Sequence, residues 1–219
     1  MALVVQTLSE QIFTLVRDRI ISGSLPVEVA IRQDALAAEL GVSKIPLREA
    51  LVRLEQEGLL SSQANRGFFV RPMTASEAEE VYALRLKIEP EAVAQAAALA
   101  TPADHKAARE ALEALDRAAS EDHKSEVGRL NRAFHLSLVR PLGRQVTLQI
   151  IERLNIIAER YVSKHLEPAG RDDRAHQEHS TLLDLWMRGK GEEASELMHA
   201  HIAETLYDLR KEFENDKRA

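Results

Sequence analysis

The sequence predicts a mainly α-helical protein in which one small β-hairpin separates a short helical region from a long one. Apolar residues recur at helical spacing from about residue 76 almost to the end of the 219-residue chain. Before them, three short helical stretches are followed by LLSSQ and FFVRP, which flank the polar turn ANRG and indicate a hairpin. We therefore expect two domains, residues 1–72 and residues 73–219.

The first domain begins with three predicted helices. The first has apolar residues at helical spacing as far as Ile20. The second covers about residues 33–40 and ends before Gly41, a residue type common just past a helix. The third follows Ser43, which can cap it, and has Pro46 in its first turn, where a missing N–H removes no intrahelical bond.

Two short helices joined by GVS and followed by a hairpin form the pattern of a winged helix-turn-helix, a DNA-binding fold. The third helix turns its apolar residues toward the core and presents Lys44 and Arg48, one turn apart, on its other face. Cations there can reach phosphates and guanine edges, and Arg66 and Gly67 lie at the hairpin tip. The alternative is that these residues form an ordinary solvated surface.

The second domain is predicted to be an all-α antiparallel bundle of six helices. Breaks at TP, SED, PLG, EPAG and GKG separate the helices, and Ser76 and Glu79 have the spacing of a capping box at the start. Pro90 is expected to kink the first of these helices without ending it. The expected ranges are residues 76–99, 103–119, 123–139, 145–165, 171–188 and 191–214.

Charge is divided unevenly between the two domains. The chain has 29 Lys+Arg and 35 Asp+Glu, but residues 1–72 hold eight of each, so all of the excess acidity lies in the second domain. A net-neutral first domain favours modest non-specific DNA affinity and a need for two copies. The absence of cysteine excludes disulfides and thiolate metal sites. We find no signal peptide and no membrane-spanning stretch, and expect a cytoplasmic protein.

The histidines of the second domain indicate a binding site. His179 and His201 lie 11 residues on either side of Lys190, in the predicted turn between the last two helices, so they should lie level with each other. Asn131 and His135, one turn apart, lie on the inward edge of the third helix of the bundle. Three inward imidazoles favour a divalent metal, and the alternative is that each is a hydrogen-bonded core histidine.

Arg85 is a charged residue in the middle of an apolar stripe on the first helix of the bundle. A buried guanidinium needs an anion. That anion could be an internal partner such as Glu89, or an anionic ligand held jointly by Arg85 and the metal. The sequence leaves both possibilities open.

The first domain resembles the N-terminal domain of GntR-family transcription regulators over about 55 residues, from LVRDRIISGSL through VSKIPLREALVRLEQEGLL to NRGFFV. The resemblance implies a winged helix that binds an operator in double-stranded DNA. The family usually carries Arg where this chain has Lys44, whereas Arg48 matches the pattern directly. The residues expected to face DNA are Arg32, Ser43, Lys44, Ile45, Arg48, Arg53, Arg66 and Gly67.

The second domain is similar to the FCD effector-binding domain, through LRLKIEPEAVAQAA, NRAFHLSL, EHSTLLDL and LMHAHIAETL. Its six predicted helices suggest the VanR-like branch of the FadR subfamily. The resemblance implies a divalent metal, zinc first and nickel, manganese or iron otherwise. It also implies a small carboxylate or sugar-acid effector contacted by Arg85. Arg144 stands where the family often has Asn, and it either replaces a pocket contact to the effector or is exposed. The implied metal ligands are Asn131, which replaces the family's Asp, and His135, His179 and His201.

We therefore expect a ligand-responsive transcription regulator, a homodimeric repressor whose effector alters operator affinity, without catalytic residues. One alternative is a metal-dependent enzyme of the di-iron carboxylate type, which needs two Glu-x-x-His motifs. The chain offers only Glu196-x-x-His199, and His199 is predicted to point outward. Another alternative is a DNA-bound helical protein with structural histidines and no effector.

Overall fold

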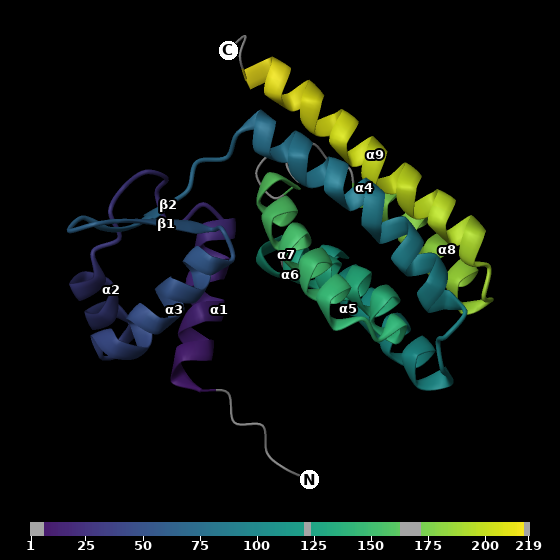
Figure 1. Cartoon of the computed structure of the whole chain (residues 1–219), viewed down its shortest axis with the longest axis horizontal. Helices are drawn as coiled ribbons and strands as arrows, with labels where there is room; N and C mark the ends of the chain where they lie inside the picture. Colours follow the sequence, from purple (N-terminus) through teal and green to yellow (C-terminus); the bar gives the residue numbers. More distant parts are fainter. Residues whose placement is uncertain (1–6, 121–123, 163–171, 217–219) are drawn as a thin grey trace. The chain divides into compact units, whose positions relative to one another are not determined.

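The structure, a computed structural model, describes residues 7–120, 124–162 and 172–216. It divides into two compact units, Met1–Met73 and Thr74–Ala219, whereas the boundary expected from the sequence lies after residue 72. The first unit consists of α1 (Leu8–Ile21), α2 (Gln33–Leu40), α3 (Lys44–Gln56) and the antiparallel strands β1 (Leu60–Gln63) and β2 (Gly67–Val70), as Figure 1 shows.

The core of the first unit lies between α1 and α3. Helix α3 fully buries the apolar stripe seen in its sequence, Leu47, Ala50, Leu51 and Leu54. Burying a leucine side chain contributes about 1.5–3 kcal/mol, so this stripe determines which face of α3 stays exposed. Ser43 occupies the N-cap of α3 but makes no capping hydrogen bond through its side chain.

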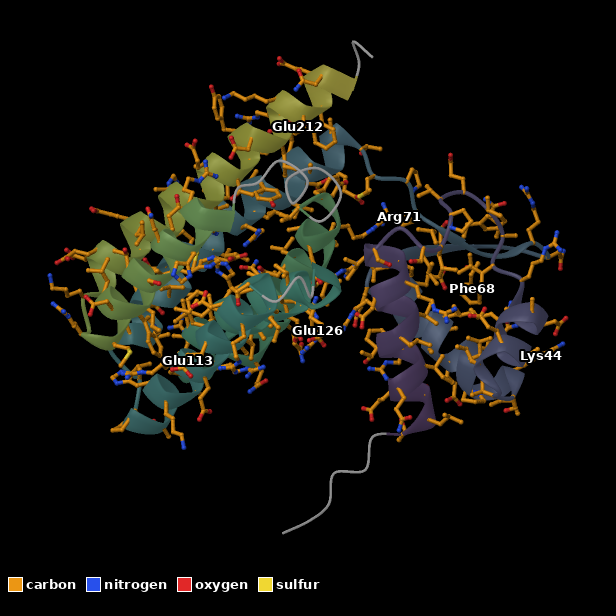
Figure 2. The ribbon with its side chains drawn as sticks, turned by 180° about the vertical axis from the view of Figure 1, so that it is seen from behind. Lys44, Phe68, Arg71, Glu113, Glu126 and Glu212 are labelled. Atoms are coloured by element: carbon orange, nitrogen blue, oxygen red, sulfur yellow. The ribbon has the colours of Figure 1, made fainter. Side chains whose placement is uncertain are left out.

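The hairpin follows α3 directly, with Leu60 opposite Val70 and Gln63 opposite Gly67. This register leaves Arg66 exposed in the turn between the strands. Phe68, labelled on β2 in Figure 2, is buried, so the hairpin is anchored on one side to the rest of the unit. The order of three helices and a hairpin is that of a winged helix-turn-helix.

The second unit is an all-helical bundle, and the predicted mainly α fold class is confirmed. The predicted helix ends at residues 123, 163–165 and 171 lie outside the described residues. The described helices are α4 (Ala75–Ala97), α5 (Pro102–Ser120), α6 (Lys124–Val139), α7 (Gln145–Tyr161), α8 (Asp172–Met187) and α9 (Gly191–Asp216), with a 3₁₀ turn at Arg140–Leu142.

Helices α4 and α9 lie side by side along much of their lengths (Figure 1). A Cβ at Gly191, the first residue of α9, would lie only 2.7 Å from the carbonyl oxygen of Ala94, so glycine permits this close approach. Pro90 lies inside α4 without ending it, as expected. Helices α6 and α7 also pack on α4, and α5 and α8 complete the bundle.

The capping box predicted at Ser76 and Glu79 is wrong by two residues. Thr74 is the N-cap of α4, and its side chain accepts a hydrogen bond from the Glu77 N–H at 3.1 Å. Both pairs have the same spacing, so spacing alone could not choose between them. Glu79 instead pairs with Arg210 of α9, at 2.5 and 2.6 Å.

Candidate metal centre

Three histidines from three helices meet in the interior of the second unit. The ring centroids of His135 on α6 and His179 on α8 are 5.0 Å apart. His201 on α9 lies 5.3 Å from the first and 4.9 Å from the second. One nitrogen of each ring lies within 4.8 Å of the other two. The structure thus brings together the three imidazoles that the sequence placed on inward faces.

Two of these imidazoles lack the hydrogen bonds that buried histidines normally make. Among the described residues, both ring nitrogens of His135 lack a hydrogen-bond partner, and so does Nε2 of His179. An unpaired buried polar atom costs about 1–3 kcal/mol. Zinc–nitrogen bonds of about 2.0–2.1 Å place two ligand nitrogens at most about 4.2 Å apart. Small side-chain movements would therefore let one divalent ion satisfy all three rings.

Burial keeps the imidazoles of His135 and His179 uncharged. It lowers the pKa of His135 well below the ordinary value, and the neighbouring His179 and His201 lower it further. The pKa of His179 is also well below the ordinary value, first through burial and then through His201 and His176. Because a metal binds the neutral imidazole, both residues are already in the ligating form near neutral pH.

His201 is oriented by a carboxylate. Its Nδ1 lies 2.6 Å from Oε2 of Glu178, one residue before His179 on α8. A carboxylate accepts only, so Nδ1 carries the hydrogen and Nε2 remains as the possible ligand. This hydrogen bond lowers the pKa of Glu178. Histidines that bind metals commonly donate their second N–H to a carboxylate in this way.

Asn131 is half-buried and lies on α6 one turn before His135. It lines a cavity of about 570 Å³ together with all three histidines. Its amide oxygen is a neutral donor of the kind that hard divalent ions accept. The four predicted ligands therefore share one cavity.

Arg85 has an internal partner. It is buried and donates two hydrogen bonds to Glu89, at 2.7 and 3.2 Å. Asn155 on α7 donates a third to the same carboxylate at 2.9 Å. Of the two possibilities left open by the sequence, the internal salt bridge is the one observed, although Arg85 also lines the cavity.

The structure does not place Arg144 among the residues that line the cavity, which agrees with the exposed alternative. It is the exposed residue before α7. His199 is exposed, as its position on α9 predicted. His176 is also exposed and bonds Asp116 of α5 at 2.8 Å.

Sequence reasoning missed Tyr82 and Glu178, which both line this cavity. Tyr82 lies three residues before Arg85, so helical spacing could have placed the two on one face of α4. Glu178 gave no such signal, because its contact with His201 depends on how α8 and α9 are rotated against each other.

The residues expected to face DNA are exposed, apart from Gly67, which is half-exposed. Lys44, labelled in Figure 2 near α2, forms an ion pair with Asp34 of that helix. The guanidinium of Arg53 lies 4.5 Å from the ring centroid of Phe13 on α1. Arg48 projects from the same exposed face of α3 as Lys44.

A winged helix-turn-helix followed by an all-helical bundle defines a class of DNA-binding transcription regulators. Residues 8–70 match the model of bacterial regulatory proteins of the gntR family, and residues 80–204 match the FCD domain. The chain belongs to the GntR family and carries an FCD domain. It is a transcription regulator, and the di-iron enzyme alternative has no support.

Similar proteins and a similar solved structure agree with the assignment to this family. The Nta operon transcriptional regulator of Aminobacter aminovorans is 33% identical over 173 residues, which are 78% of this chain and 80% of that protein. The HTH-type transcriptional repressor GlaR of Escherichia coli is 28% identical over 198 residues, covering 85% and 88%. The solved structure of E. coli McbR/YncC has the same fold, with a TM-score of 0.81 at 23% identity over 95% and 100% of the two chains.

No described helix is long and apolar enough to cross a membrane.

Proposed function

We propose that the helical domain binds one divalent metal ion through Asn131, His135, His179 and His201, and binds a carboxylate-type effector beside it. The observation that carries this proposal is the cluster of three imidazoles, two of which have unpaired nitrogens in the described structure. Three nitrogen donors and one oxygen suit zinc, with nickel, manganese or iron as alternatives.

The charge of the cavity supports an anionic effector. Three neutral imidazoles and one amide bring no negative charge to a divalent ion. Arg85 is already neutralised by Glu89, and this pair leaves the balance at the metal unchanged. An effector that contributes a carboxylate oxygen would offset the excess positive charge within a buried space, where such an interaction is strong.

We further propose that the protein is a homodimeric repressor whose operator affinity changes when the helical domain is occupied. GlaR, one of the relatives named as repressors, supports the direction of regulation. A winged helix reads one half-site, so two copies are expected on an operator. Val146 and Ile150 are 70% and 49% exposed on one face of α7, which gives a second copy an apolar surface to cover.

The test is a DNA-binding measurement on the full chain. Duplex sites would be selected from a random pool with the zinc-loaded protein, and their affinity measured with zinc and after chelation. We expect the affinity to change by about 5–150-fold, the usual range of allosteric coupling, and the change to disappear in His179→Ala. Equal affinity in both conditions for the wild type would contradict metal-linked regulation.

A further inference from the structure

An exposed carboxylate lies beside the first residue of α3, the predicted recognition helix. Asp34, near the start of α2, forms an ion pair with Lys44, the first residue of α3. The two side chains are 78% and 67% exposed, so both are available to a duplex that approaches this surface. An ion pair at such exposure adds little to stability. A role in folding therefore does not account for an acidic residue at this position.

The start of α2 lies close to both elements that are expected to face DNA. One is the N-terminal end of α3, where helix-turn-helix proteins contact base edges in the major groove. The other is the tip of the hairpin. A Cβ added to Gly67 would lie 3.8 Å from Nε2 of Gln33, the residue before Asp34. A duplex bound by both elements therefore passes close to the carboxylate of Asp34.

A carboxylate at this surface is favourable only where it meets a hydrogen-bond donor, because it repels phosphates and can only accept. The donors in the major groove are the N4 amino group of cytosine and the N6 amino group of adenine. Adenine places its N7 acceptor beside the amino group, and that lone pair repels the second carboxylate oxygen. Cytosine offers a donor and no acceptor on this edge, so the chemistry of Asp34 selects cytosine.

The ion pair with Lys44 positions this carboxylate and offsets its charge. An ammonium group has three hydrogens, so Lys44 can hold Asp34 with one of them and keep the others for a neighbouring phosphate. The two side chains together thus present an acceptor for a base and a cation for the backbone.

We propose that Asp34 is a specificity-determining residue that accepts a hydrogen bond from the N4 amino group of a cytosine in the operator. Lys44 is its positioning residue. This inference goes beyond the proposed function and rests only on DNA binding by the winged helix, so it needs neither the metal nor the effector.

The test is selection of duplex sites from a random pool with the full chain, in parallel for the wild type, Asp34→Asn and Asp34→Ala. The wild type should enrich a cytosine at one fixed position, and replacing it should lower the measured affinity about fivefold or more. In Asp34→Asn this position should change to adenine, because an amide pairs with N6 and N7 together. Asp34→Ala removes the same charge and should accept any base there.

Glu39→Gln is the matched control. Glu39 is exposed near the other end of α2 and pairs with Arg19 of α1, so this variant should select the same site as the wild type. The inference is overturned if Asp34→Asn selects the same cytosine as the wild type, since a cation that binds the paired guanine would then explain the preference. It is also overturned if Asp34→Asn and Asp34→Ala change the affinity equally for all sequences, since Asp34 would then act only through its charge.

Discussion

The imidazoles of His135 and His179 are buried, uncharged and without hydrogen-bond partners for three of their nitrogens in the described structure. A single unsatisfied buried histidine can be tolerated, and three such atoms in one cluster are the observation on which the proposed metal site rests. His201 differs, because Glu178 already fixes its orientation. At the scale of single residues, Asn131 distinguishes the proposed metal site, since an amide stands where the family resemblance implies a carboxylate.

Asn131→Asp should tighten metal binding. A carboxylate at this position adds a negative charge beside a divalent ion, and we expect an affinity gain of about tenfold or more, which corresponds to about 1.4 kcal/mol. The measurement is competition with a chromophoric chelator on the full chain. Asn131→Ala is the control and should bind no more tightly than the wild type. If Asn131→Asp also gains nothing, Asn131 is outside the coordination sphere.

The pairing of His179 with His201 could be predicted because it depends on local spacing. His179 and His201 are equally distant from the turn at Lys190, so any tight antiparallel hairpin brings them level. The pairing of Arg85 with Glu89 is likewise one helical turn. The direction of Arg144 could not be predicted, because a residue just outside a helix has no periodicity to fix it.

At the scale of elements, an exposed ion pair connects α2 with α3. Lys44, at the first position of α3, forms an ion pair with Asp34 near the start of α2. A cation is unfavourable at a helix N-terminus, so Asp34 offsets that charge. Both side chains are largely exposed, so the pair contributes little to stability. The ion pair matters for DNA binding, because Asp34 partly neutralises the charge of Lys44, which is predicted to contact a phosphate.

Asp34→Asn should therefore raise affinity for random duplex DNA and reduce discrimination in favour of the selected operator. Freeing Lys44 to neutralise one more phosphate should steepen the slope of log affinity against log salt by about 0.9. Fluorescence anisotropy over a range of salt concentrations measures this slope. Glu113→Gln, an equal change of charge at an exposed position on α5, should leave it unaltered. An unchanged slope in Asp34→Asn would show that Lys44 does not contact phosphate.

Element boundaries could be predicted to within a few residues, because apolar periodicity and breaks at Gly and Pro mark them. The expected N-cap of α4 lies two residues too late, since Thr74 and Ser76 are each followed three residues later by Glu. The Tyr161 hydroxyl accepts a hydrogen bond from the Thr74 N–H at 3.2 Å and donates to its carbonyl oxygen at 3.1 Å. These bonds come from a residue 87 positions away, and no local pattern carries that information.

At the scale of the whole molecule, the chain combines a net-neutral DNA-reading unit with an acidic helical unit. A neutral module gains little from non-specific attraction to DNA, so we expect operator binding to depend on base contacts and on the proposed second copy. Regulation then requires two conformational states of different operator affinity. The ligand of the helical unit must bind one of these states more tightly than the other. The proposed metal and the carboxylate beside it supply that difference in the present account.

Metal analysis of the purified protein decides whether the three histidines hold a divalent ion. Full-length protein would be purified without chelator and without a nickel affinity tag, and then analysed by plasma mass spectrometry. We expect about one divalent ion per chain, absent in His179→Ala and retained in His199→Ala, whose imidazole is exposed on α9. A wild-type chain that carries no divalent ion, or a His179→Ala chain that carries as much as the wild type, would contradict the account.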